Sequence, residues 1–179
     1  MSDQISQEQV NQLWLKLALI LINNGISMLE KAFNLTPSIL TYNDITQILR
    51  QYFPTQQITH LDNNYRVIPI EQWRQLIAVD WTDTKKWVLD YFDCDNFSNY
   101  FAANMAFFYE INSVGRVYGK LYKGTDQFVA YHYFNVIITS DRKIWFFEPE
   151  NDTLTETDYQ GGILLIGGNK YEPISFIFG

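Results

Sequence analysis

The feature that most constrains the fold is a run of apolar residues at positions 97–111. A helix that is apolar on nearly every side has to be covered by other elements. The sequence therefore predicts a buried central helix over residues 95–111, with the rest of the chain packed around it. The apolar residues distributed around this helix are Phe97, Phe101, Ala102, Met105, Phe108 and Tyr109.

Helical spacing also marks three segments that precede this run. Thr41 and Asp44 form the pattern of a capping box, which begins a helix, and Pro54 ends that helix. In the first of these segments, residues 6–32, apolar residues recur at helical intervals. Helices are therefore expected over residues 6–32, 42–53 and 71–79.

The second half of the chain is patterned for strands. Residues 129–139 are aromatic and β-branched, and a polar turn at residues 139–143 joins them to a returning strand. Helices first and strands second indicate an α+β fold, in which the N-terminal helices and the central helix pack on an antiparallel sheet. The expected strands cover residues 57–61, 65–69, 114–122, 129–139, 144–148, 163–166 and 174–178.

The length and the charge of the chain limit the number of domains it can form and the classes of partner it can bind. The chain has 179 residues, of which 47% are hydrophobic and 18% charged, and these values suit one globular domain. We interpret residues 1–55 as a helical extension and residues 56–179 as the core. The net charge of −7 argues against a nucleic-acid partner, because phosphate binding needs clustered Lys and Arg.

The N-terminal residues indicate where in the cell the protein is expected to be. The apolar run at residues 13–22 contains Lys16 and is much shorter than a membrane span, which needs about 20 residues. We expect a buried helix there, and no membrane partner. The polar N-terminus lacks the basic region of a signal peptide, so a cytoplasmic protein is expected.

The only cysteine of the chain, Cys94, directly precedes the central helix. Asp95 or Asn96 is a suitable N-cap, so Cys94 is predicted at or just before the helix N-terminus. Backbone N–H groups and the helix dipole stabilise a thiolate at such a position. This placement makes Cys94 a candidate nucleophile, and the simpler alternative is a structural cysteine.

Two further candidate residues, His132 and Glu148, lie on the two arms of the predicted hairpin. Pairing of the arms about Asp141 would set His132 opposite Glu150 and beside Glu148. Cys94, His132 and Glu148 would then supply a nucleophile, a base and a residue that orients the base. The alternative is a histidine that is merely hydrogen-bonded within a strand.

Acidic residues surround the cysteine and suggest a metal ion. Asp93 and Asp95 flank Cys94, and negative neighbours oppose formation of a thiolate. A divalent cation with oxygen ligands would compensate this charge, and such ligands favour calcium. The alternative is that Asp95 only caps the helix.

Three motifs in order resemble a known family, the C-terminal domain family of a fungal agglutinin, whose relatives also occur as lone phage and bacterial proteins. The family pattern is about D-C-D-D-F, then H-x-x-N, then E-P-Q. Similarity extends over residues 65–150, about half of the chain, and does not include the N-terminal helices. The matching segments are residues 93–97 (DCDNF), 131–135 (YHYFN) and 145–150 (WFFEPE).

This resemblance implies a papain-like fold and a calcium-dependent cysteine protease with Cys94, His132 and Glu148 as catalytic residues. It places Asp95, Asn96 and Glu150 at the calcium site. The chain departs from the family pattern, because Asn96 replaces the second aspartate and Glu150 replaces the glutamine. No sugar-binding repeat accompanies the domain, so the resemblance does not extend to lectin activity.

We therefore predict a papain-like cysteine peptidase, or a related acyl-transfer enzyme, that acts on a protein or peptide substrate. Two alternatives stay open. The domain could be a catalytically silent papain-like binding module. It could also be an interaction protein, for instance a phage-encoded inhibitor that acts through its N-terminal helices, which could equally form a homodimer.

Overall fold

The fold is described from a computed structural model of the chain, for residues 12–13, 16–17, 32–124, 127–156 and 164–179. The chain divides into two compact units, Met1–Leu35 and Thr36–Gly179. All elements described below belong to the second unit. The predicted helix over residues 6–32 lies almost entirely outside the described residues.

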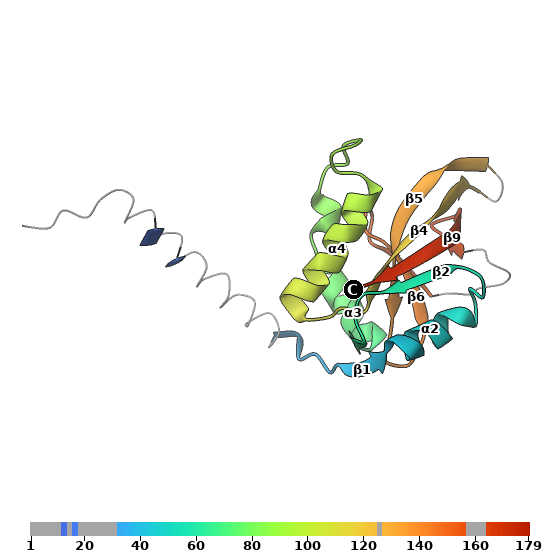
Figure 1. The fold of residues 1–179 in the computed structure, drawn as a ribbon. Coiled ribbons are helices and arrows are strands. Elements are labelled where there is room, and N and C mark those ends of the chain that lie inside the picture. Colours follow the sequence, from blue (N-terminus) through green and yellow to red (C-terminus); the bar gives the residue numbers. More distant parts are fainter. Residues whose placement is uncertain (1–11, 14–15, 18–31, 125–126, 157–163) are drawn as a thin grey trace, which may run out of the picture. The chain divides into compact units, whose positions relative to one another are not determined.

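The second unit contains the other predicted helices. α2 spans Tyr42–Arg50, α3 spans Ile70–Ile77 and α4 spans Cys94–Tyr109 (Figure 1). The capping box at the start of α2 is confirmed, because Thr41 Oγ1 accepts from Asp44 N at 3.2 Å while Asp44 Oδ2 accepts from Thr41 N at 2.9 Å. A short 3-10 helix, Thr82–Thr84, lies between α3 and α4.

The strands form two sheets, so the described part of the chain is α+β. One sheet pairs β1 with β3, and the other has seven strands in the order β2-β9-β4-β5-β6-β7, with β8 also on β9. The sequence patterns miss β1 and β7. The strands are β1 Ser38–Thr41, β2 Gln57–His60, β3 Asn64–Val67, β4 Val114–Lys123, β5 Gln127–Ile138, β6 Ile144–Glu148, β7 Thr153–Glu156, β8 Leu164–Ile166 and β9 Asn169–Phe178.

The large sheet is mixed, which corrects the prediction of an antiparallel sheet. β2 runs parallel to β9, whereas the other pairs in this sheet are antiparallel. A parallel pair needs a long connection between its strands. Here the connection comprises most of the chain, from β3 to β8, and sequence patterns do not indicate which strand β2 will meet.

The predicted register of the hairpin between β5 and β6 is confirmed. Asn135 pairs with Phe147 and Ile138 pairs with Ile144, as expected for a turn about Asp141. Residues that are neighbours in a strand point to opposite faces of the sheet. In β6, Phe146 contacts Phe53 with ring centroids 5.8 Å apart, whereas Phe147 contacts Phe101 of α4 at 4.4 Å.

The sheet is therefore covered by α4 on one face and by the α2 segment on the other. α4 packs on β4 and β5 through Phe97, Phe101 and Met105, which are all buried. The prediction that this helix is buried holds for only part of it, because 64% of Phe107 is exposed. Among the described helices, none combines the length and the apolar character that a membrane span requires.

Candidate functional site

Cys94 is the first residue of α4, and its position at the helix N-terminus is confirmed. The cap, however, is Asp93 rather than the predicted Asp95 or Asn96. Asp93 N donates to Asn96 Oδ1 at 3.2 Å, which forms half of a capping box, and the Asp93 side chain accepts from the backbone of Asn96 in return. Cys94 is half-buried and forms no disulfide.

His132 and Glu148 form a buried hydrogen-bonded pair. His132 Nε2 lies 2.7 Å from Glu148 Oε2, and both side chains are almost fully buried. The Tyr171 hydroxyl donates to the same Glu148 oxygen at 3.1 Å. Two neighbours thus hold one oxygen of this carboxylate in place, while it orients the imidazole.

The thiol of Cys94 completes a chain of hydrogen bonds with this pair. Burial opposes protonation of His132, but its hydrogen bonds to Cys94 and Glu148 outweigh burial and raise the pKa of His132 to about 10. The structure thus brings together the three residues that the sequence nominated. The roles of nucleophile, base and orienting residue stay predictions.

Asn135 does not take part in this chain. It is fully buried, and its Nδ2 donates to Ser98 O at 3.1 Å and to Gly115 O at 3.4 Å. Because Asn135 is an odd number of positions from His132, it faces the other side of β5. Its amide therefore ties α4 and β4 to β5 instead of contacting the imidazole.

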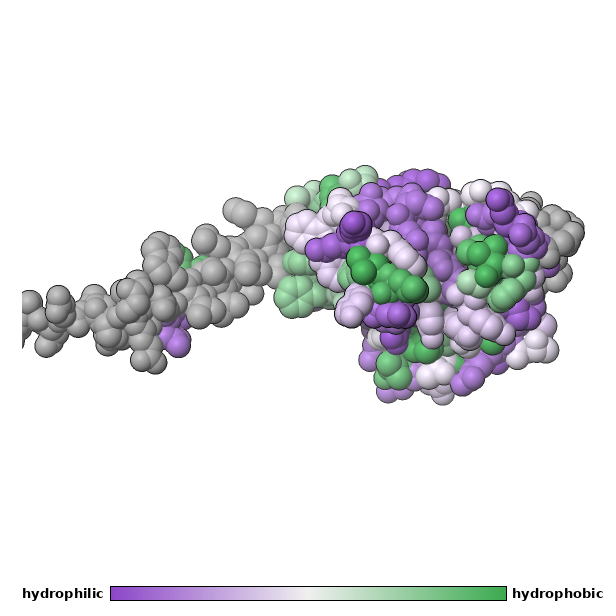
Figure 2. Space-filling model, turned by 90° about the horizontal axis from the view of Figure 1, so that it is seen from above, coloured by the Kyte–Doolittle hydropathy of each residue, from purple (hydrophilic) through white to green (hydrophobic). Residues whose placement is uncertain are grey.

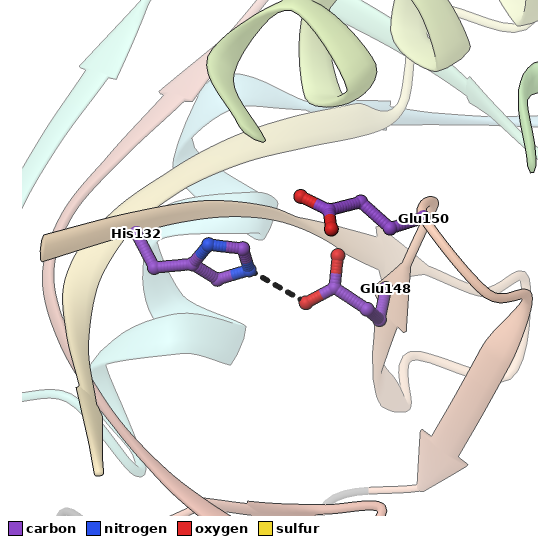
Figure 3. A group of neighbouring side chains, drawn as sticks. All are labelled: His132, Glu148 and Glu150. Carbon is purple, nitrogen blue, oxygen red and sulfur yellow. Dashed lines mark hydrogen bonds and ion pairs between the residues drawn. The ribbon is translucent and has the colours of Figure 1, made fainter. Parts of the chain in front are cut away.

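Glu150 joins His132 and Glu148. One potential ligand atom from each of the three side chains lies within 4.8 Å of the other two, and Figure 3 shows the Glu150 carboxylate above that of Glu148. Burial raises the pKa of Glu150, and the Glu148 carboxylate adds to this effect. The described part of the chain contains one such group of His, Cys, Asp and Glu side chains.

The residues of the predicted calcium site have different partners. A hydrogen bond from Asp95 lowers the pKa of Asp93, and the same bond, with burial and repulsion, raises the pKa of Asp95. Asn96 Oδ1 is engaged in the capping box, and Glu150 lies with His132 and Glu148. The calcium site formed by Asp95, Asn96 and Glu150 stays a prediction.

An aromatic surface on β4 and β5 was not identified from the sequence as a site. Ring centroids in this cluster, here called the tyrosine face, are 5.0–5.8 Å apart from one residue to the next. About half of Phe128 and of Tyr131 is exposed. The cluster consists of Tyr118, Tyr122, Phe128, Tyr131 and Tyr133.

The tyrosine face extends to the start of α4. Burial raises the pKa of Tyr133, and its neighbours Tyr118, Asp95 and Cys94 add to this effect, so these groups are near one another. Seen from above, apolar patches stand between hydrophilic areas of the surface (Figure 2). Further exposed apolar residues precede α4, namely Trp81, Trp87, Val88, Leu89 and Tyr91. The signal that could have revealed the tyrosine face is the alternation of aromatic residues with other residues along β4 and β5.

Comparison with known proteins gives the fold. No family model and no curated protein matches the chain. Among solved structures, a PSL1a-E64 complex matches with a TM-score of 0.56 at 18% identity, over 78% of this chain and 51% of that one. The Polyporus squamosus lectin, bound to the human-type influenza-binding epitope Neu5Aca2-6Galb1-4GlcNAc, matches with a TM-score of 0.55 at 18% identity, over 78% and 49%.

This chain therefore spans about half the length of the structures it resembles. The comparison corrects the prediction of a calcium-dependent cysteine peptidase or acyl-transfer enzyme. The finding against hydrolase or thiol-protease activity is that a lectin is among the similar structures, and the alternative prediction was a binding module. The physical reason is that a thiol, an imidazole and a carboxylate in contact also occur in purely structural hydrogen-bond networks.

Proposed function

We propose that the unit Thr36–Gly179 is a binding module that holds a glycan on the tyrosine face. The observation that carries this proposal is the row of aromatic rings on β4 and β5, of which Phe128 and Tyr131 are about half exposed. Exposed aromatic surface that forms a continuous patch is typical of an interaction site. A cluster of tyrosines adds hydroxyl groups to that apolar surface.

The chemistry of the tyrosine face suits a sugar ring. A pyranose offers a flat face of C–H groups, which can stack on an aromatic ring, and hydroxyl groups around its edge. Lys120 pairs with Tyr131 across the two strands, and its Nζ lies 3.7 Å from Glu172 Oε1. Rings flanked by a few charged groups are the combination by which binding sites orient a ligand.

The wider comparison supports the same proposal. The lectin that shares this fold was solved with a sialylated trisaccharide. We further infer that the arrangement is papain-like, in the sense that a helix beginning with Cys94 packs on the sheet that carries His132. On this proposal the domain belongs to the C-terminal domain family of the fungal agglutinin and serves as a scaffold for binding.

The proposal is tested by screening the protein on a glycan array and measuring the best glycan by calorimetry. Tyr131→Ala removes one exposed ring from the centre of the row and should weaken binding at least about tenfold, since tenfold corresponds to about 1.4 kcal/mol. Phe107→Ala is the matched control, because Phe107 is at least as exposed as Tyr131 but lies on α4. This variant should bind as the wild type does.

Two results would contradict the proposal. One is a protein that binds none of the glycans on the array, and in that case a protein or peptide partner becomes the better hypothesis for the tyrosine face. The other is a glycan that both variants bind as tightly as the wild type does.

A further inference from the structure

We propose that His132, Glu148 and Glu150 form a binding site for a divalent first-row transition metal ion such as Zn²⁺. The three side chains come from β5, from the end of β6 and from the residues directly after it. They converge in Figure 3, where the imidazole faces Glu148 and the two carboxylates lie one above the other. One atom of each lies within 4.8 Å of the other two.

The distances between the potential ligand atoms need to change little for the group to accept an ion. Zn²⁺ binds histidine nitrogen and carboxylate oxygen at about 2.0–2.2 Å, which places neighbouring ligand atoms of a tetrahedral site about 3.3–3.6 Å apart. His132 Nε2 and Glu148 Oε2 are now 2.7 Å apart. A small opening of this hydrogen bond, with loss of its proton, would therefore admit the ion.

An unpaired oxygen independently points to a ligand. Glu148 is 3% exposed, and its Oε1 is buried without a hydrogen-bond partner. In Figure 3 this oxygen points toward the carboxylate of Glu150. A buried carboxylate oxygen that has no donor is costly, and a second carboxylate beside it adds repulsion. A cation between the two carboxylates would remove both costs.

The surrounding contacts are those that hold metal ligands in position. The Tyr171 hydroxyl donates a hydrogen bond to Glu148 Oε2 at 3.1 Å, and Cys94 hydrogen-bonds to the His132 ring. Ligating carboxylates and imidazoles are usually fixed by such outer hydrogen bonds. The site would therefore be largely formed before the ion arrives.

The ligand set selects the class of metal. Calcium takes six to eight oxygen ligands, whereas this site offers one imidazole nitrogen and two carboxylates. Imidazole suits zinc and other first-row transition metals, and carboxylates are compatible with them. The proposed site thus shares Glu150 with the predicted calcium site, but it uses His132 and Glu148 in place of Asp95 and Asn96.

The experiment titrates the metal-free protein with Zn²⁺ alone by calorimetry. We expect one ion per chain and a higher melting temperature with Zn²⁺, because a ligand that binds only the folded state stabilises it. Glu150→Gln keeps the size of the side chain and should lower the affinity at least about tenfold. Asp95→Asn and the exposed Glu71→Gln are controls that should bind as the wild type does.

A Co²⁺ spectrum of the wild-type protein identifies the ligand atoms, so this test works even if a variant does not fold. The proposed nitrogen and oxygen ligands give visible bands without the near-ultraviolet charge-transfer band of a thiolate. A thiolate band would overturn the assigned ligand set, since Cys94 would then bind the ion. Absence of Zn²⁺ binding to the wild type would overturn the proposal, and so would binding that is lost in Asp95→Asn but kept in Glu150→Gln.

Discussion

At the scale of single residues, Asn135 links three elements through one amide. Its Nδ2 donates to carbonyl oxygens of Ser98 in α4 and Gly115 in β4. Since the residue is fully buried, water cannot replace these bonds. This interior amide therefore adds to the apolar contacts that position α4 on the sheet.

Asn135→Asp should lower the free energy of unfolding by at least about 3 kcal/mol, because aspartate has no N–H donors and would bury a charge beside two carbonyl oxygens. Asn99→Asp is the matched control. Asn99 is exposed, and its Oδ1 accepts from Arg116 Nη1 at 2.9 Å, which a carboxylate can also do. Urea unfolding of both variants is the measurement, and equal stability would contradict the role of Asn135.

His60 predicts a pH dependence of stability. Its Nε2 lies 2.8 Å from Thr46 Oγ1 and its Nδ1 lies 3.2 Å from the Tyr65 hydroxyl. Burial lowers the pKa of His60 in the folded state. The contribution of neutral His60 is therefore fully present above the unfolded pKa of about 6.5 and is lost as pH falls through the lower folded pKa.

We expect the stability difference between wild type and His60→Gln to shrink from pH 8 to pH 5. Comparing the two proteins cancels the titration of all other groups, including that of His132. The measurement is urea unfolding at several pH values. A difference that stays constant with pH would show that His60 has the same pKa in the folded and unfolded states.

At the scale of elements, β4 is held close to both of its neighbours at Gly119. This residue pairs with His132 of β5 and with Pro173 of β9, next to a register shift. A Cβ atom at Gly119 would lie 2.7 Å from the carbonyl oxygen of Glu172. The close approach of β9 behind His132 thus depends on the absence of a side chain.

Gly119→Ala should lower stability by about 1–3 kcal/mol, because the backbone of β9 has to move. Gly124→Ala is a useful comparison. Nothing lies within 4 Å of a Cβ atom there, and only the φ of +61° opposes a side chain, so the loss should be at the low end of 1–3 kcal/mol. Thermal unfolding of the two variants would contradict this account if Gly119→Ala were the less affected.

At the scale of the whole molecule, the main core belongs to the second unit. Among the described residues, the buried members of one hydrophobic cluster lie between Leu40 and Phe178, and they include side chains of α2, β4, β5, β6 and β9. The division of the chain falls after Leu35, so β1 and α2 are part of this unit. A compact unit with its own core is expected to fold alone.

A chain that lacks residues 1–35 should therefore unfold cooperatively, with a melting temperature within about 3 °C of the full chain, which corresponds to less than about 1 kcal/mol. Differential scanning calorimetry of both chains is the measurement. A truncated chain without a cooperative transition would show that the core needs the first unit.

Several features were predictable because they depend on residues close in sequence. The Thr41 cap, the start of α4 near Cys94 and the pairing of β5 with β6 follow from capping chemistry, apolar periodicity and a short turn. The meeting of His132 and Glu148 follows in turn from that hairpin register.

Other features depend on contacts between distant segments, which local patterns do not encode. The parallel pairing of β2 with β9 places residues 57–60 beside residues 175–178. An apolar or aromatic strand residue can equally lie in the core or on the surface, so the exposure of Tyr131 was not predictable.

The sequence by itself determined that Cys94 stands at the start of a helix and that His132 meets Glu148, because helix capping and hairpin register are local. Only the tertiary structure decided that Glu148 keeps one oxygen without a partner and faces Glu150. It also decided that a row of rings on β4 and β5 is exposed. Burial, unlike local geometry, is set by the packing of the whole chain, and burial decides what an unpaired polar group costs.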